Sequence, residues 1–148
     1  MRNKLFLEFP SKVDEELYNA IISLLPQVTL KKPLPTREDI ITILSSDSSK
    51  ILTARYPDMN GQIVGMLSCV YYNVPSGKFG HLDDVVVDSN YRRKGIAKAL
   101  IEKALNFFKE INVHRVDLTS NPSRIEANQL YFALGFKKRN TNSFYKNL

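Results

Sequence analysis

The chain has 148 residues, and 21 lysines and arginines against 15 aspartates and glutamates give it a formal net charge of +6. With 43% hydrophobic residues, this length suits one domain with a single core of ordinary size. The longest apolar runs extend over only a few residues, whereas a membrane-spanning helix needs roughly 20. We therefore expect a single domain over residues 1–148 and no membrane association.

The excess positive charge lies in the second half of the chain. Residues 1–75 hold eight basic and eight acidic side chains, so the whole +6 lies in residues 76–148. An excess of this kind favours an anionic partner without identifying it. The acidic residues within the first thirty positions are untypical of a signal or transit peptide, so we expect a cytoplasmic protein.

Cysteine, histidine and glycine usage excludes several kinds of chemistry. Cys69 is the only cysteine, and with two distant histidines it provides neither an internal disulfide nor a structural zinc site. We expect Cys69 to be a small buried side chain and expect no metal. The six glycines form no Walker loop, dinucleotide fingerprint or Gly-x-Ser-x-Gly turn, which excludes the nucleotide and serine hydrolysis that depend on them.

The first fifty residues predict one strand followed by two helices. Residues 5–9 are typical of a strand and are followed by a proline. Ser11 and Asp14 have the spacing of a capping box before a run of apolar residues at helical intervals. Thr36 and Asp39 repeat that spacing before a second, shorter helix. We expect helices over about residues 12–46, separated by a proline-rich connection.

Three strands are predicted next. Residues 51–56 and 63–72 are joined by turn-forming residues 57–61, which favours an antiparallel hairpin. Residues 72–78 are expected to form a loop. The strand over residues 79–88 then ends in three consecutive valines, 85–87, which indicates burial on both faces.

The last third of the chain predicts two helices and three strands. The clearest apolar stripe predicts a helix over about residues 94–111, followed by a strand over 113–119. Ser123 and Glu126 have capping-box spacing at the start of another helix, which Gly135 ends. Two short strands, 136–139 and 143–146, complete the chain.

The predicted fold is α+β, with a mixed, mostly antiparallel sheet of about seven strands and about four helices.

The chemistry is predicted at the junction between the valine strand and the clearest helix. A helix start leaves about four N–H groups without acceptors and carries roughly half a positive charge, so it attracts anions. Gly95 permits close approach of a phosphate to the backbone, and Arg92, Arg93 and Lys94 add charged donors. The alternative is a solvated basic loop with a turn glycine.

At this junction the sequence resembles the GNAT superfamily of acetyl-CoA-dependent N-acetyltransferases. The family motif Arg/Gln-x-x-Gly-x-Gly/Ala matches residues 92–97, with alanine in the last place. The preceding Asp-Val-Val-Val-Asp, residues 84–88, and the later segment 127–136, which contains Tyr-x-x-x-Gly-Phe, are also similar to the family. These motifs cover residues 80–139 and imply the family's mixed sheet, whose strands diverge in a V.

The resemblance also implies roles for individual residues. The strand end would pair with the pantetheine arm of CoA through Val85, Val86 and Val87. The pyrophosphate would lie against the helix start, at Arg92, Arg93, Lys94, Gly95, Ile96, Ala97 and Lys98. Asn128 would hydrogen-bond the pantetheine arm or lie close to it, and Tyr131 would lie near the thioester sulfur. Alternatively, Asn128 is a solvated helix residue and Tyr131 a core aromatic.

The implied reaction is direct transfer of an acetyl group from acetyl-CoA to a primary amine. An alkylammonium has a pKa of about 10.4, so the amine must lose a proton before or during attack. Asp83 and His81 share one strand face, and both are candidate bases. Alternatively, water alone takes the proton, and the charges at this strand end are simply exposed and have no catalytic role. A backbone N–H near Val85 would polarise the carbonyl, and Tyr131 would protonate the departing thiolate.

Two other functions compete with this hypothesis, and the acceptor stays open. A non-catalytic CoA-sensing or partner-binding domain of the same fold is the first alternative. A nucleic-acid binder ranks last, because Tyr91 is the only aromatic residue beside the basic cluster. An aminosugar, a polyamine, an amino-acid derivative or a protein amine could be the acceptor, chosen by residues 12–46 and 72–78. We expect a monomer or homodimer.

Overall fold

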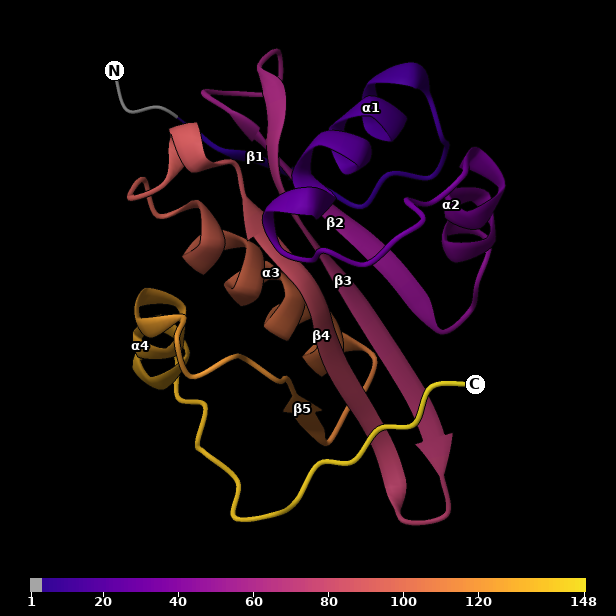
Figure 1. Ribbon diagram of the computed structural model, residues 1–148, viewed down its shortest axis with the longest axis vertical. Coiled ribbons are helices and arrows are strands. Elements are labelled where there is room, and N and C mark those ends of the chain that lie inside the picture. Colours follow the sequence, from indigo (N-terminus) through magenta and orange to yellow (C-terminus); the bar gives the residue numbers. More distant parts are fainter. Residues whose placement is uncertain (1–3) are drawn as a thin grey trace.

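The computed structural model describes residues 4–148, which form one mixed sheet with helices on both faces (Figure 1). In spatial order the strands are β1 (Phe6–Glu8), β2 (Ser49–Tyr56), β3 (Gln62–Val74), β4 (Gly77–Val87) and β5 (Arg115–Asp117). Neighbouring strands are antiparallel, except that β4 and β5 are parallel. The five strands of the described residues confirm the α+β class and its mixed, mostly antiparallel sheet.

Within residues 4–148, four α-helices and two short 3₁₀ helices surround the sheet. They are α1 (Glu15–Leu24), η1 (Leu25–Gln27), α2 (Arg37–Leu44), η2 (Ser89–Tyr91), α3 (Ile96–Glu110) and α4 (Ile125–Ala133). The helices α1 and α2 pack on one face and α3 on the other, so the sheet separates two apolar clusters. Figure 1 shows α4 beside α3. None of the helices found between residues 4 and 148 is long and apolar enough to cross a membrane.

Local sequence determines where α1 and α2 begin. The capping box predicted at α2 is present: Thr36 Oγ1 accepts from the Asp39 N–H at 3.2 Å, and Asp39 Oδ2 accepts from the Thr36 N–H at 2.8 Å. The hydrogen bond from the Thr36 N–H, and after it the Thr36 hydroxyl, lowers the pKa of the Asp39 carboxyl. The helix α1 begins later than the Ser11 spacing predicts, because Asp14 itself caps it by accepting from the Leu17 N–H at 2.8 Å.

The strand β4 contains an extra residue relative to β3. Met66 pairs with Val86 and Ser68 pairs with Asp83, so two residues of β4, Asp84 and Val85, lie opposite Leu67 alone. Asp84 has φ +49°, which is consistent with a β-bulge at that point. The bulge changes which face the side chains occupy: Leu82 joins the cluster against α3, whereas Val86 joins the cluster against α1 and α2. Simple alternation would put Leu82 and Val86 on the same face.

The expectation of about seven strands is wrong in its last two members. Residues 134–148 form neither helix nor strand, and Phe144 and Tyr145 are about nine-tenths exposed. A strand needs a partner edge, and β5 is only three residues long, so it offers little edge for further pairing. The expected loop 72–78 is also shorter, because β3 continues to Val74 and β4 starts at Gly77.

The contact between β4 and α3 generates a test of the packing. A Cβ added at the buried Gly80 would lie 2.8 Å from Cε1 of Phe108, which is itself 1% exposed. We expect Gly80→Ala to lower the free energy of unfolding by about 1–3 kcal/mol through overpacking. Urea denaturation measures this change.

The matched comparison introduces the same substitution into a Phe108→Leu background. There the ring that a Cβ at Gly80 would meet is gone, so Gly80→Ala should cost less than in the wild type. Equal costs in both backgrounds would show that the ring contact does not determine the effect.

Candidate active site

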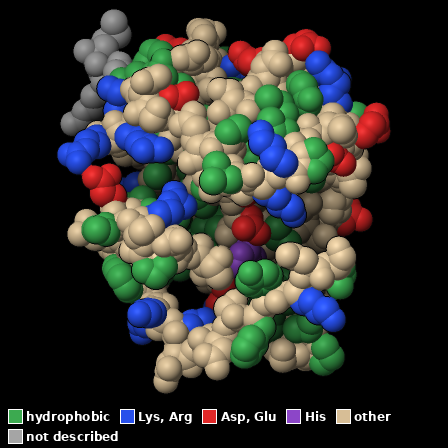
Figure 2. All heavy atoms as spheres, in the orientation of Figure 1, with side chains coloured by type: hydrophobic (Ala, Val, Ile, Leu, Met, Phe, Trp, Pro, Cys, Tyr) green, Lys and Arg blue, Asp and Glu red, His purple; other side chains and the backbone are tan. Residues whose placement is uncertain are grey.

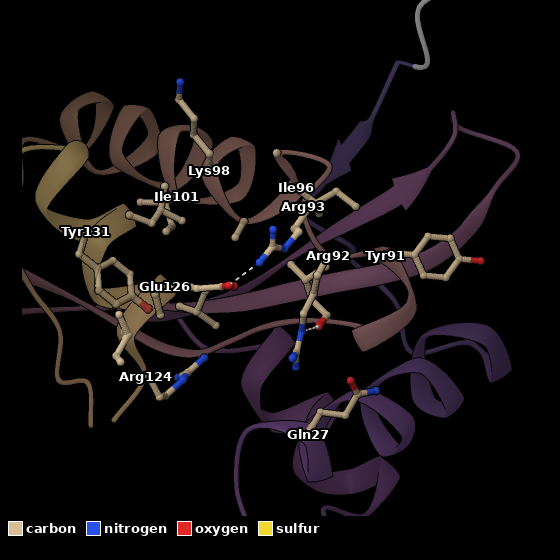
Figure 3. A pocket seen from close by; sticks show the side chains of 17 residues that line it. Gln27, Tyr91, Arg92, Arg93, Ile96, Lys98, Ile101, Arg124, Glu126 and Tyr131 are labelled. Atoms are coloured by element: carbon tan, nitrogen blue, oxygen red, sulfur yellow. Dashed lines mark hydrogen bonds and ion pairs between the residues drawn. The ribbon is translucent and has the colours of Figure 1, made fainter. Parts of the chain in front are cut away.

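A pocket of about 530 Å³ lies between the end of β4, the start of α3 and the helix α4 (Figure 3). Its lining includes most of the residues that the sequence assigned to a cofactor: Val85, Val87, Arg92, Arg93, Gly95, Ile96, Ala97, Lys98 and Tyr131. Val85 and Tyr131, which are 46 positions apart in the chain, therefore meet around one cavity.

One wall of the pocket is an open strand edge. The strand β5 pairs with β4 only at Phe79, Gly80 and His81, although β4 continues to Val87. Beyond His81, β4 has no neighbouring strand on that side within residues 4–148. Exposed backbone N–H and C=O groups at a strand edge can hydrogen-bond an extended chain. This edge is suited to a linear ligand that carries amide groups.

The opposite end of the pocket is the N-terminus of α3. Gly95 precedes the helix with φ +76°, a conformation that favours glycine, and no atom lies within 4 Å of a Cβ built there. The first N–H groups of α3 have no acceptor within the helix. Arg92 and Lys98 lie beside them, and Arg92 Nε donates to the carbonyl oxygen of Val87 at 3.5 Å. This end of the pocket suits an anion.

An ion pair spans the pocket between the loop before α3 and the first turn of α4. Arg93 Nη2 lies 2.9 Å from Glu126 Oε1, as Figure 3 shows, and the two side chains are 83% and 73% exposed. An exposed pair of this kind contributes little to stability, so an incoming anion can compete for Arg93 at small cost. The capping box predicted from Ser123 to Glu126 is absent, which leaves the Glu126 carboxylate available for this contact.

Three residues predicted to bind the cofactor do not line the pocket. Val86 is 4% exposed and packs in the cluster against α1 and α2, because the bulge in β4 shifts the alternation. Lys94 lies over the ring of Tyr56, with Nζ 5.2 Å from the ring centroid. Asn128 Nδ2 donates to the backbone oxygen of Asn121 at 3.0 Å, so its amide holds the loop before α4.

Tyr131 contributes a phenol to the pocket lining. It is 7% exposed, and its ring packs edge-on against Phe136 with centroids 5.9 Å apart. Burial raises the pKa of Tyr131 above its ordinary value, and the positive charge of Arg124 partly offsets that rise. The phenol is therefore protonated at neutral pH and can donate a proton within the pocket.

The candidate bases lie together on β4, but outside the pocket lining. His81 Nε2 and Asp83 Oδ2 are 3.7 Å apart, with side chains 31% and 59% exposed. They lie on the strand face opposite Leu82, which packs against α3. The pKa of the neighbouring Asp84 is raised, chiefly by desolvation and secondarily by the charge of Asp83. The space-filling view shows a histidine side chain in a hollow near acidic ones (Figure 2).

Several residues of the pocket were not predicted from the sequence. Gln27, from η1, accepts from the Ser89 N–H through Oε1 at 2.9 Å and reaches the pocket from a segment about sixty residues away. Arg124 and Glu126 come from the start of α4. Nearness in sequence to Tyr131, seven positions further on, could have identified Arg124. No pattern in the sequence around Gln27 predicts that it reaches the pocket.

The geometry supports binding of a ligand with one anionic end and one amide-bearing arm. The anion would lie against α3 and the arm against the edge of β4, with Tyr131 beside the arm. Over residues 4–148, His, Cys, Asp and Glu side chains form no group of three that could hold a metal ion.

The chain is similar in sequence to known acetyltransferases. A family model described as the acetyltransferase (GNAT) family matches residues 15–136. N-acetyltransferase 8 from Homo sapiens is 30% identical over 135 residues, which are 83% of this chain and 59% of that protein. The human N-acetylaspartate synthetase is 41% identical over 59 residues, 40% of this chain and 20% of that protein. The chain thus spans less than two thirds of the length of these curated relatives.

Solved structures share the fold at low sequence identity. An aminoglycoside acetyltransferase from an uncultured soil metagenomic sample has a TM-score of 0.84 at 21% identity, over 97% of this chain and 96% of that one. AAC(6')-Iy, solved with the bisubstrate analog CoA-S-monomethyl-acetylneamine, has a TM-score of 0.79 at 18% identity, over 98% and 99%. Together with the family model, which covers most of its length, these findings show that the chain belongs to the acetyltransferase (GNAT) family.

Proposed function

We propose that this chain transfers an acetyl group from acetyl-CoA directly to a primary amine, with residues 1–148 acting as one cytoplasmic N-acetyltransferase domain. One observation carries the proposal: the cationic start of α3, the open edge of β4 and the buried Tyr131 border the same pocket. CoA has a polyanionic end and an amide-bearing arm, which match the first two. A protonated phenol beside the arm could give a proton to a departing thiolate.

The residues present fit the cofactor. The free N–H groups of α3, with Arg92, Arg93 and Lys98 around them, would hold the pyrophosphate. The β4 edge at Val85 and Val87 would hydrogen-bond the pantetheine amides as an added strand does. The CoA bisubstrate analog in the related fold of AAC(6')-Iy supports this proposal. We retain Val86 for its backbone groups only, since its side chain faces the other cluster.

The chain's own groups would manage the protons of the reaction. When bound, acetyl-CoA supplies the acetyl group as a thioester, whose carbonyl carbon bonds to the amine nitrogen while the carbon–sulfur bond breaks. Asp83, His81 or water takes the proton that the amine loses. A backbone N–H near Val85 polarises the carbonyl oxygen, and Tyr131 gives its proton to the sulfur that receives the electron pair. The proton from the amine finally restores the phenol.

The acceptor is left as an amine of unassigned class. N-acetyltransferase 8, N-acetylaspartate synthetase and the aminoglycoside acetyltransferases carry names that point to different acceptors. The face of β4 that carries His81 and Asp83, together with α1 and α2, would select among them. A CoA-sensing domain without catalysis is the second candidate, since the binding half of the pocket would serve it equally well.

Removing two pocket cations tests the cofactor assignment. We expect Arg92→Gln combined with Lys98→Gln to raise the Kd for acetyl-CoA about tenfold or more, because charge-assisted hydrogen bonds to phosphate are lost. Isothermal titration calorimetry measures both affinities. The control is Lys103→Gln with Lys109→Gln, which removes the same charge from exposed positions of α3 that do not line the pocket.

The comparison between the two double variants decides the outcome. Equal weakening in both would mean that net charge alone attracts the cofactor. No heat of binding for wild-type protein would refute the cofactor assignment for the enzyme and for the CoA-sensing alternative. Binding without release of free CoA in the presence of an amine panel would favour the CoA-sensing alternative.

Replacing Tyr131 by phenylalanine tests the acid. Only the protonated phenol can donate, so the activity it provides is present below its folded pKa and is lost as the pH rises through it. Burial raises that pKa, which places the loss above the ordinary tyrosine value of about 10. We expect Tyr131→Phe to lower kcat about a hundredfold at neutral pH and to remove this alkaline decline. Tyr145→Phe, in the exposed tail, is the control, and unchanged kcat in Tyr131→Phe would exclude the acid role.

A further inference from the structure

Arg124 is a pocket cation that the proposed function has not yet used. It immediately precedes α4 and lines the pocket on the side of Tyr131. Arg93, the neighbouring arginine, is paired with Glu126 at 2.9 Å. Within residues 4–148 the guanidinium of Arg124 makes no ion pair. Its charge is therefore not neutralised by a carboxylate of the described chain.

The loop before α4 fixes the position of Arg124. Asn121 Oδ1 accepts from the Ser123 N–H at 2.9 Å and from the Ser123 hydroxyl at 2.8 Å. Asn128 Nδ2 donates to the Asn121 backbone oxygen at 3.0 Å, and the Arg124 N–H donates to the same oxygen at 3.0 Å. Side chains on both sides of Arg124 thus hold its backbone in place. This accounts for Asn128, whose amide the sequence assigned to the cofactor.

Arg124 and Tyr131 line the same pocket from one short segment of the chain. Arg124 is the N-cap residue of α4, and Tyr131 lies seven positions further on, inside the helix. Figure 3 shows the guanidinium and the phenol extending toward the cavity. Val85, Val87 and Ile101, which also line this pocket, are uncharged. Glu126, the acidic residue of this lining, pairs with Arg93, so the Arg124 guanidinium lines the pocket of the proposed proton donor without an ion-pair partner among residues 4–148.

We propose that Arg124 is a positioning residue for proton transfer, whose cation stabilises the negative charge that develops on the Tyr131 oxygen and the departing sulfur. This inference rests on the proposed function. When the carbon–sulfur bond breaks, its electron pair moves to sulfur, and the proton leaves the phenol, so the Tyr131 oxygen becomes negative. A cation that lines the pocket beside the phenol stabilises such charge electrostatically. Arg124 acts through Tyr131 and accepts no proton itself.

Other charges that face the same pocket are arranged differently. Arg92 and Lys98 lie at the start of α3, where the pyrophosphate would occupy them, and Arg93 is matched by Glu126. Arg124 is the group whose charge lowers the pKa of Tyr131 against the rise caused by burial. Removing that charge should therefore raise the pKa of the phenol further and weaken it as an acid.

The first experiment measures ionisation of Tyr131 in the protein without cofactor. Carbon-13 labelling of the tyrosine rings and NMR titration give the value, and the resonance missing from Tyr131→Phe identifies the residue. We expect Arg124→Gln to raise the pKa by about half a unit or more, and Arg124→Lys to restore it toward wild type. Lys103→Gln removes the same charge from the exposed face of α3 and should leave the pKa of Tyr131 unchanged. An unmoved titration in Arg124→Gln overturns the inference, whatever the activity.

The second experiment separates the acid step from cofactor binding. At saturating acetyl-CoA, Arg124→Gln should lower kcat about three- to tenfold at neutral pH and move the alkaline decline upward, with rescue by Arg124→Lys. A higher KM for acetyl-CoA with unchanged kcat would overturn the inference and make Arg124 a phosphate anchor. If wild-type protein transfers no acetyl group while the NMR shift persists, the proposed function fails and the coupling between Arg124 and Tyr131 stands.

Discussion

The parting of β4 from β5 is the constraint on which the pocket depends. Three residue pairs join these parallel strands, and β4 then continues to Val87 without a neighbour on that side among residues 4–148. The bulge at Asp84 adds a change of face, so that Val85 and Val87 line the pocket while Val86 packs against α1 and α2. Without the parting of the strands, the backbone groups at the end of β4 would be hydrogen-bonded to a neighbouring strand. Without the bulge, the side chains there would lie on the other face of the sheet.

Part of the excess positive charge of the second half of the chain lies around the pocket. Arg92, Arg93 and Lys98 surround the first turn of α3, where N–H groups without acceptors add to their field. Glu126 partly balances this group through Arg93, and Arg124 stands apart beside Tyr131. The positive charge of the pocket is thus concentrated at the start of α3, and one further cation, Arg124, lies near the proposed acid.

Local signals predicted the fold better than they predicted the site. The capping box at Thr36, the helix α3 and the positive φ of Gly135 follow from neighbouring residues and were predictable. The bulge depends on pairing between β3 and β4, which alternation along one strand does not reveal, so the sequence alone does not predict which face of the sheet Val86 occupies. Gln27 reaches the pocket through tertiary packing alone. The prediction of strands over residues 136–139 and 143–146 was wrong, because β5 offers only three residues of edge for pairing.

Hydrogen–deuterium exchange with and without acetyl-CoA tests the central claim most directly. The claim is that the β4 edge and the start of α3 bind opposite ends of one cofactor. We predict that acetyl-CoA slows exchange of the N–H groups at residues 85–87 and 95–98 together, because both sets become hydrogen-bonded. Saturating acetyl-CoA that leaves both segments unprotected, or that protects a region remote from this pocket, would contradict the account.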